Sequence, residues 1–496
     1  MRTRWKEAIR MVKRGLKGGI LRYISKEQVE SIHAATLEVL ERVGMSSDSK
    51  RIMEVFKEAG AEVDFKSKLI RIPQGLVEEA IRKAPKEIIL CGRNPRHDIL
   101  LEGSRIYFGL GGTPTPYVLD VETSKFRRPT KQDFADATRL GDALPNMSYI
   151  MSIAGAFDVP YEVEYLHEFE AMFNNTEKPI VYSAPGAETA KRVLEMASTV
   201  MGGLEELRRK PILSLYSETA SPLSFATENE NMIEFAKAGV PITLGPMPLA
   251  GATAPVTVCG AAVIGNSESL SALTLIQLVN PGAPTIYSGW GGVMDPRTGR
   301  CAYGAPEFTM VTAGINAQMA HYYGLPSFGF GGCSDSKMPD AQAGAEVMMN
   351  ALMSGLSGVN LIHDCGYLAG GSVGSMEMAV ICDEVVGMVS RIVRGVTVDD
   401  ESLAVEVIGN VGPGGHFLSQ KHTLRFVERE IYIPKIFDRR PEEVWKRAGE
   451  KDIREVAKEK VKGILKEHYP EPLPKDIKQR LVEIVKKAER ELVKKQ

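Results

Sequence analysis

The sequence predicts an α/β protein built on a (β/α)8 TIM barrel, with an N-terminal α+β extension and a C-terminal helical tail. Eight short runs rich in β-branched or aromatic residues lie between residues 105 and 364, and plausible amphipathic helices separate most of them. Strands that alternate with helices form a parallel sheet, and eight of them favour a closed barrel over an open doubly wound sheet. A chain of 496 residues with 44% hydrophobic content can bury a core of this size.

The N-terminal extension is expected over residues 1–95. Ser25 and Gln28 have the spacing of a capping box, and apolar residues then recur at helical spacing as far as Gly44. A second helix is expected from about Ser49 to Ala59. The alternation in "AEVDFKSKLIRIP" predicts a short hairpin, and "GLVEEAIRKAP" returns to helix. This part of the chain is therefore predicted to be a small α+β domain.

The barrel is expected over residues 96–430. Its strands are predicted at "RIYFG" (105), "YIMSIAG" (149), "PIVYS" (179), "PILSLYS" (211), "PITLG" (241), "PTIYSG" (284), "PSFGFGG" (326) and "NLIHD" (360). Several follow a proline directly, which removes no donor from the middle of the ladder. A hairpin is expected in "TPTPYVLDVETSKFRRPTKQ", and "SLAVEVIG" after Arg394 is strand-like. Charged helices are expected over residues 431–496, as an exposed or dimer-contacting tail.

The charge, the cysteine pattern and the lengths of the apolar runs limit the classes of ligand and location to be expected. A formal net charge of −2 gives no general reason to expect nucleic acid, so the expected ligand is small. Six cysteines without a C-x-x-C pair suit free thiols in a reducing cytoplasm. The N-terminal "MRTRWKEAIRMVKRGLKGG" lacks the apolar core of a secretory signal, and no run of about 18 apolar residues predicts a membrane span. We expect a cytoplasmic protein.

The working groups of such a barrel lie at the carboxyl ends of its strands. These ends are rich in glycine, hydroxyls and aromatics and carry few charges. Aromatic faces can surround a quaternary ammonium without anionic partners, although packing inside the barrel is the simpler interpretation of any single ring. The candidate binding residues are Tyr107, Phe108, Tyr182, Tyr216, Tyr287, Trp290 and Phe330.

Two histidine segments leave alternatives open. His363 and Cys365, with the distant Cys382, have the residue types of a zinc site, but Cys382 lies in an apolar helix where a structural thiol is the simpler interpretation. We therefore predict no metal and treat His363 as a possible hydrogen-bond donor at the end of the eighth strand. His416, in "GPGGHFLSQKHTLRF", belongs to a structural turn, to the rim of the active site or to a surface that docks a partner.

Several stretches together resemble one family. They are "LEVLERVGMSSDSKRIMEVFKEAGAEVD", "IPQGLVEEAIRKAPKEIILCGRNP", "GGCSDSKMPDAQAG", "GVNLIHDCGYL", "GPGGHFLSQKHT" and "RPEEVWKRAGEKDIREVA", in this order. The chain resembles the trimethylamine methyltransferase superfamily, in its branch without pyrrolysine, and is similar to glycine betaine corrinoid methyltransferases. All 496 positions hold ordinary residues, which favours a quaternary amine over trimethylamine.

The resemblance implies a catalytic barrel that moves a methyl group from a quaternary amine, such as glycine betaine, to cob(I)alamin on a separate corrinoid protein. No tightly bound cofactor is then expected in this chain. The protein is expected to form a homo-oligomer. His363 is the expected donor to a substrate carboxylate, and Glu218 could orient the substrate. Asp335 and Lys337 lie near the position where pyrrolysine would be expected. The alternatives are a zinc-dependent methyltransferase using His363 and Cys365, and a non-catalytic betaine-binding barrel.

Overall fold

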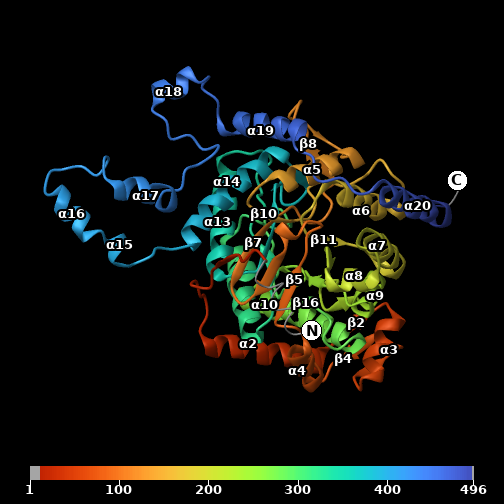
Figure 1. Cartoon of the computed structure of the whole chain (residues 1–496). Coiled ribbons are helices and arrows are strands. Elements are labelled where there is room, and N and C mark those ends of the chain that lie inside the picture. Colours follow the sequence, from red (N-terminus) through yellow and green to blue (C-terminus); the bar gives the residue numbers. More distant parts are fainter. Residues whose placement is uncertain (1–11, 494–496) are drawn as a thin grey trace.

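Eight parallel strands form the centre of the computed structural model, which describes residues 12–493 (Figure 1). They are β7 (Arg105–Leu110), β10 (Met147–Ile150), β11 (Ile180–Ser183), β12 (Leu213–Ser217), β14 (Ile242–Leu244), β16 (Thr285–Ile286), β18 (Phe328–Phe330) and β19 (Leu361–Cys365). Each pairs with the next in chain order except β16 with β18, and β19 returns to β7. The remaining gap is bridged between Tyr287 and Ser327. The predicted TIM-like barrel and its eight strands are confirmed.

Helices cover the outside of the barrel. They are α5 (Lys131–Ala143), α6 (Glu164–Asn175), α7 (Gly186–Met201), α8 (Leu204–Arg209), α9 (Glu230–Ala238), α10 (Val258–Val279), α11 (Pro306–Thr309), the π-helix η5 (Met310–Ile315), α12 (Asn316–Tyr323), α13 (Ala341–Ser357) and α14 (Met376–Val393). Short 3-10 turns are η2 (Pro95–His97), η3 (Tyr161–Val163) and η4 (Thr227–Asn229). Within residues 12–493, α10 alone has the length and apolarity to span a membrane, but it is mostly buried in the body.

The connections that follow the barrel strands build two small sheets at the carboxyl ends. One has the order β20 (Tyr367–Leu368), β21 (Val373–Gly374), β8 (Tyr117–Leu119) and β9 (Phe126–Arg127), and the other pairs β15 (Leu249–Ala250) with β17 (Gly292–Val293). The antiparallel pairing of β8 with β9 confirms the predicted hairpin. These sheets surround the end of the barrel where a catalytic site is expected.

The N-terminal extension contains α2 (Lys26–Glu38), the π-helix η1 (Val39–Val43), β2 (Met45–Ser47), α3 (Lys50–Glu58), β3 (Glu62–Asp64), β4 (Leu69–Arg71), α4 (Gln74–Lys83), β5 (Glu87–Leu90) and β6 (Ile99–Glu102). The capping box of Ser25 and Gln28 is present, and β3 and β4 form the predicted hairpin. Strand β2 pairs with β13 (Ser224–Phe225), which follows β12, and β1 (Leu16–Lys17) pairs with β7. The extension is thus joined to the barrel by strand pairing. Most of the basic N-terminal stretch, residues 1–11, lies outside the described residues.

The chain after α14 corrects one expectation. The strand-like "SLAVEVIG" is helical, forming α15 (Asp400–Leu403) and α16 (Val405–Val411). Asp399 caps the first helix by accepting a hydrogen bond from the Ser402 amide at 2.7 Å, and no neighbouring strand offers these residues a ladder. The tail continues with α17 (Lys421–Glu430), α18 (Glu442–Arg447), α19 (Ile453–Glu467) and α20 (Lys475–Leu492). The limits proposed for three domains, 1–95, 96–430 and 431–496, stay a prediction.

Candidate active site

An aromatic cluster lies inside the barrel near the carboxyl ends of its strands. The ring of Tyr216 lies 5.4 Å from that of Phe328, which in turn lies 4.2 Å from the His363 ring. Trp290 stacks on Phe330 at 6.5 Å and meets His363 edge-on at 5.4 Å. Three of the predicted binding residues, Tyr216, Trp290 and Phe330, are therefore brought together. Phe328 completes the cluster and was missed, although it lies in the same "PSFGFGG" stretch.

The other four predicted aromatics lie elsewhere. The Tyr107 hydroxyl is 2.9 Å from the Leu100 carbonyl and accepts a hydrogen bond from the Gly15 amide at 2.8 Å, so it belongs to the amino end of the barrel. Phe108 follows Tyr107 and points to the opposite side of β7. That is the side where Ile106 lies, 3.5 Å from the position of a Cβ on Gly355 in α13. Phe108 is thus removed from the predicted pocket by strand alternation, and Tyr107 by its position at the amino end of the barrel.

Tyr182 and Tyr287 point outward into the helical layer. The Tyr182 hydroxyl donates to Glu168 of α6 at 2.9 Å, and its ring packs on Phe134 and Phe169. The Tyr287 hydroxyl donates to Asn266 of α10 at 2.6 Å. Both rings therefore pack between barrel and helices, where strand alternation directs them.

His363 is neutral and has one nitrogen already used. Its Nδ1 lies 2.8 Å from the Gly329 carbonyl, so Nδ1 carries the proton and donates it there. Burial lowers the pKa of the ring to about 4. Its Nε2 has no proton and lies 3.4 Å from the carboxyl of Asp364. This geometry does not favour the expected role of His363 as a donor to a substrate carboxylate.

Asp364 is a candidate that the sequence reasoning missed. Its φ of +73° is a left-handed conformation that non-glycine residues rarely adopt, and the pairing of β19 with β7 shifts register at this position. Its amide donates to the Gly111 carbonyl at 2.7 Å, which holds the bulge. Strain of this kind concentrates at functional sites. The signal available in the sequence was a carboxylate at the end of the strand "NLIHD".

The Asp364 carboxyl is buried, with only 4% of the residue exposed. Burial, together with the nearby negative charge of Glu218, raises its pKa well above the usual value for aspartate. Burial lowers the pKa of His363 at the same time, so desolvation favours the neutral form of both groups.

Glu218 lies at the carboxyl end of β12 and accepts a hydrogen bond from the Tyr216 hydroxyl. The residue reaches solvent, yet protein surrounds the carboxyl closely enough to desolvate it and raise its pKa. Among residues 12–493, neither Lys nor Arg forms an ion pair with Glu218 or with Asp364. The mouth of the barrel thus carries two carboxyl groups that no cationic side chain of the described chain neutralises.

Three polar groups near the barrel strands lack a protein partner within the described part of the chain. They are the Trp290 Nε1, the Ser288 Oγ and the Tyr149 hydroxyl, all buried. Buried donors are almost always paired in folded proteins, because an unpaired one costs about 1–3 kcal/mol. Unpaired donors beside an aromatic cluster therefore indicate a place for a ligand.

The described residues do not bring His363, Cys365 and Cys382 together as the three ligands of a zinc ion. The Cys365 thiol contacts Cys382 on α14, while His363 faces the aromatic cluster, because the bulge at Asp364 turns the two side chains apart. No group of three His, Cys, Asp or Glu side chains within residues 12–493 is arranged to hold a metal ion. All six cysteines are free thiols.

The remaining predicted residues lie outside the cluster. The Asp335 carboxylate accepts hydrogen bonds from the amides of Tyr303 at 3.2 Å and Gly304 at 2.9 Å. Lys337 is exposed, and its ammonium donates to the Asp335 carbonyl at 2.7 Å. His416 is exposed in the connection between α16 and α17, which lies away from the barrel (Figure 1). Tyr303, which Asp335 positions, packs 5.4 Å from Phe330 and was missed.

Fold and site together define a class: a TIM-like barrel with an aromatic and carboxyl-lined site at the carboxyl ends of its strands, suited to a small positively charged ligand. The chain belongs to the trimethylamine methyltransferase (MTTB) family, whose model matches residues 2–493. Members of this family are methyltransferases of methylamine metabolism, and the family-level resemblance seen in the sequence is confirmed.

Two relatives with different substrates in their names are similar to this chain over most of its length. It is 39% identical over 468 residues to the trimethylamine methyltransferase MttB of Desulfitobacterium hafniense (strain DSM 10664 / DCB-2), covering 94% of each protein. It is 33% identical over 465 residues to the glycine betaine methyltransferase of Desulfitobacterium hafniense (strain Y51), covering 92% of this chain and 95% of the relative. Among solved structures, it is similar to the Methanosarcina barkeri monomethylamine methyltransferase (MtmB), with a TM-score of 0.48, 15% identity and coverage of 93% and 97%.

Proposed function

We propose that this protein transfers a methyl group from a quaternary amine to cob(I)alamin carried by a separate corrinoid protein. Membership of the MTTB family supports methyl transfer, and a sequence of ordinary residues supports a quaternary rather than a tertiary amine. Glycine betaine stays the named candidate because one relative is described as a glycine betaine methyltransferase. Cytoplasmic location also stays a prediction.

The single observation that carries this proposal is the aromatic cluster beside Glu218 and Asp364, two carboxyl groups with no cationic partner among residues 12–493. Aromatic faces attract an ammonium by about 0.5–2 kcal/mol, more as the site is desolvated. A ligand cation would also stabilise the ionised forms of Glu218 and Asp364, whose pKa values are raised in its absence. The site is therefore better suited to a cation than to a neutral or anionic ligand.

Methyl transfer makes a specific demand on this pocket. When the partner docks, cob(I)alamin supplies the nucleophile that accepts the methyl group. The residues of this chain hold the ammonium and exclude water, while the amine loses its charge in the transition state. A permanently ionised pair of carboxylates would stabilise the charged ground state and slow the reaction. The raised pKa values of Glu218 and Asp364 limit that negative charge.

A betaine also carries a carboxylate, which needs hydrogen-bond donors. The N–H of His363 is used on the Gly329 carbonyl, so we propose instead the unpaired Trp290 Nε1 and Ser288 Oγ. Both belong to the stretch that follows β16. A substrate carboxylate there would satisfy two buried donors for which the structure between residues 12 and 493 provides no partner.

A substrate panel tests this function. Glycine betaine, proline betaine, carnitine, choline and trimethylamine are each incubated with the protein and cob(I)alamin, and methylcobalamin formation is followed spectrally. At least one quaternary amine should react, and Asp364→Asn should lower that rate by about tenfold or more while keeping the left-handed backbone that asparagine tolerates. Reaction of trimethylamine alone would contradict the proposal.

The two alternatives give different results in the same preparation. Stoichiometric zinc that is lost in both His363→Ala and Cys365→Ala would favour the zinc-dependent methyltransferase. Calorimetric binding of a quaternary amine, without methylation of either cob(I)alamin or a corrinoid protein, would favour a non-catalytic barrel. Cys91→Ala is a matched control, because Cys91 is also buried but lies in the N-terminal part of the chain.

A further inference from the structure

A cavity of about 320 Å³ lies at the amino end of the barrel. Its wall includes Met147 at the start of β10 and Lys178 just before β11, so it lies at the opposite end of the barrel from the candidate active site. This volume is near the lower limit of the roughly 300–1,000 Å³ that small-molecule sites occupy. The polar residues of the wall are Lys13, Arg96, His97, Asp142, Ser148 and Lys178.

The ammonium group of Lys178 is buried in this wall, and only 4% of the residue is exposed. Its Nζ donates to the carbonyls of Gly141 at 2.9 Å and Leu144 at 2.7 Å, at the carboxyl end of α5, where the helix dipole favours a cation. These bonds use two of its three N–H groups. Within residues 12–493, no carboxylate forms an ion pair with it.

The surroundings of Lys178 disfavour its charged form. Burial lowers its pKa to about 8 against the opposing effect of Asp142, and the positive charges of Lys13 and Arg96 act in the same direction as burial. A buried charge is normally paired, because its desolvation is costly. An anion in the cavity would supply the missing partner and stabilise the ammonium.

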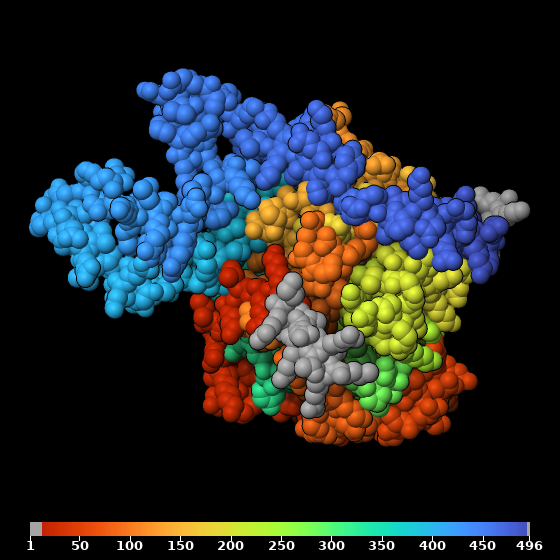
Figure 2. Space-filling view, viewed as in Figure 1, coloured from red at the N-terminus to blue at the C-terminus, as the bar shows by residue number. Residues whose placement is uncertain are grey.

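The carboxylates of Asp142 and Glu177 already have donors of their own. Asp142 accepts hydrogen bonds from the Thr176 hydroxyl, the Glu177 amide and the Nε2 of His468, each at 2.8 Å. His468 lies in the connection between α19 and α20, the dark blue helices that run along the body in Figure 2. Glu177 pairs with Arg96. Neither carboxylate is therefore committed to the buried ammonium.

The other polar groups of the wall are hydrogen-bond donors. Burial lowers the pKa of His97 to about 4, so its ring is neutral, and its Nε2 accepts a hydrogen bond from the Arg96 Nε at 2.9 Å, which leaves the proton on Nδ1. Lys13 is positioned by its amide, which donates to the Asp98 carbonyl at 3.2 Å. The Ser148 hydroxyl adds a further donor. Three cationic side chains thus face a single carboxylate in the wall.

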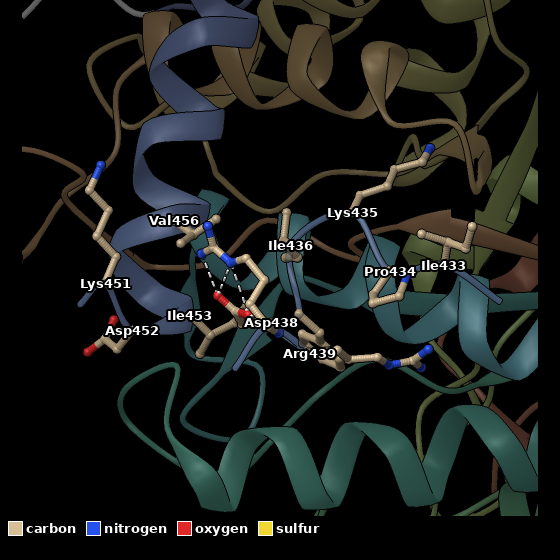
Figure 3. Close-up of a pocket in the computed structure, with 12 residues that line it drawn as sticks. Ile433, Pro434, Lys435, Ile436, Asp438, Arg439, Lys451, Asp452, Ile453 and Val456 are labelled. Carbon is tan, nitrogen blue, oxygen red and sulfur yellow. Dashed lines mark hydrogen bonds and ion pairs between the residues drawn. The ribbon is translucent and has the colours of Figure 1, made fainter. Parts of the chain in front are cut away.

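A larger hollow elsewhere in the molecule lacks this feature. It measures about 960 Å³ and lies between residues 433–440 and the start of α19, as Figure 3 shows. Arg440 pairs there with Asp438 at 2.9 Å, one of the interactions drawn as dashed lines. The cationic residues of its wall are exposed to solvent; they are Lys435, Arg439, Arg440 and Lys451. Only the smaller of these two cavities therefore buries a cation that an anion would stabilise.

We propose that the cavity at the amino end of the barrel binds a phosphate group, as free phosphate or as part of a small phosphorylated molecule. A phosphate presents at least three strong acceptor oxygens, which suits donors that approach from several sides, whereas a carboxylate presents two. Lysine binds phosphate as a point charge, and the exposed Arg96 adds a planar guanidinium at the outer part of the wall. The inference does not depend on the proposed catalytic function, because the cavity and the candidate active site lie at opposite ends of the barrel.

Calorimetric titration of the full-length protein with inorganic phosphate and with glycerol 3-phosphate tests the site. In a low-salt buffer, each chain should bind one phosphate group with a Kd of about 1 mM or lower. Lys178→Met keeps most of the side-chain volume and removes the charge, so it should weaken binding by about tenfold or more. Tighter binding of glycerol 3-phosphate would assign the site to a phosphorylated molecule, and equal binding of the two would assign it to free phosphate.

Variants of exposed residues keep the test decisive even if Lys178→Met does not fold. Lys13→Ala combined with Arg96→Ala changes two exposed residues of the wall and should also weaken phosphate binding by about tenfold. Lys17→Ala is the matched control, because Lys17 is exposed in the same N-terminal segment but lies outside the wall, and it should keep the wild-type affinity. No binding up to about 10 mM phosphate, or unchanged affinity in the double variant, overturns the proposal. Succinate that binds as tightly as phosphate also overturns it.

Discussion

Two tyrosine–glutamate pairs in this molecule have the same chemistry and different surroundings. Tyr182 donates to Glu168 between the barrel and α6, at 2.9 Å, and the other carboxylate oxygen of Glu168 accepts the Ala156 amide at 3.0 Å. Tyr216 donates to Glu218 at the mouth of the barrel, where Glu218 reaches solvent. The first pair is complete within the protein. The second leaves one carboxylate oxygen free to meet a ligand.

The comparison separates structural from functional polar groups. Burial raises the pKa of both glutamates, so a perturbed pKa alone does not identify the active site. What differs is whether every donor and acceptor has a partner. The hydroxyls of the outward-facing Tyr182 and Tyr287 have partners, whereas the Trp290 Nε1 and the Ser288 Oγ have none among residues 12–493. The unpaired Trp290 Nε1 beside the aromatic cluster therefore marks the functional side of the barrel.

The largest expected effect comes from exchanging the two glutamates. Glu218→Gln should raise KM for the quaternary amine by roughly 10²–10³-fold without lowering kcat, because a carboxylate and an ammonium about 4 Å apart attract each other by about 4 kcal/mol at an effective dielectric constant near 20, and this attraction fades as the amine loses its charge in the transition state. Glu168→Gln should lower the melting temperature and leave kcat/KM within a few-fold. Steady-state kinetics and thermal melts of both variants make the test. Equal kinetic losses in the two variants would contradict the assignment of Glu218 to the active site and of Glu168 to the structural core.

Glu268 is buried and hydrogen-bonded like Glu168, but its partners lie in the loop that follows Glu218. It is buried in α10 and accepts hydrogen bonds from the Leu223 amide and the Ser221 hydroxyl, each at 2.8 Å, in the loop that follows Glu218. Burial raises its pKa from 4.5 to about 7. Its contribution to stability is therefore fully present below about pH 4.5 and is lost as pH rises to about 7, by roughly 3 kcal/mol.

Glu268→Gln removes this titration. Between pH 4.5 and 7.5 the free energy of unfolding of the wild type should fall relative to that of the variant, which denaturant titrations at several pH values measure. Glu230→Gln, at a partly exposed glutamate on α9, serves as the control and should follow the wild type. Parallel pH profiles for the wild type and Glu268→Gln would show that Glu268 titrates near its ordinary value.

The smallest expected effects come from the two tyrosines. Tyr182→Phe leaves a Glu168 oxygen buried without its donor and should cost about 1–3 kcal/mol in the free energy of unfolding, with activity kept. Tyr216→Phe should cost less stability, because solvent can reach Glu218, and should change kcat/KM several-fold. Chemical denaturation and kinetics of the two variants compare them directly. A larger stability loss for Tyr216→Phe than for Tyr182→Phe would show that the Tyr216–Glu218 pair is the structural one.

Much of the fold could be predicted because its signals are local. Each barrel strand is a short run of β-branched or aromatic residues with its own boundaries, and the capping box at Ser25 is contained within four residues. The segment "SLAVEVIG" shows the limit of this approach. Its alternation suits a strand, but a strand needs a neighbour, and the residues around 405 have none.

The site was harder to predict because it depends on single-residue differences in register. Tyr182 and Tyr216 both stand near strand ends, yet one points outward and the other inward, since successive side chains alternate between the two faces. The bulge at Asp364 then turns His363 and Cys365 in different directions, which no regular strand would do.

The sequence by itself determined the barrel class, the order of its elements, the family and the end of the barrel where chemistry belongs. These follow from patterns within a few neighbouring residues and from the order of family-like stretches. Only the tertiary structure decided which aromatics face the interior, that Asp364 and Glu218 lie near each other, and that the Trp290 Nε1 finds no hydrogen-bond partner in the described part of the chain. Those facts depend on strand register and on contacts between residues more than a hundred positions apart, which local patterns do not record.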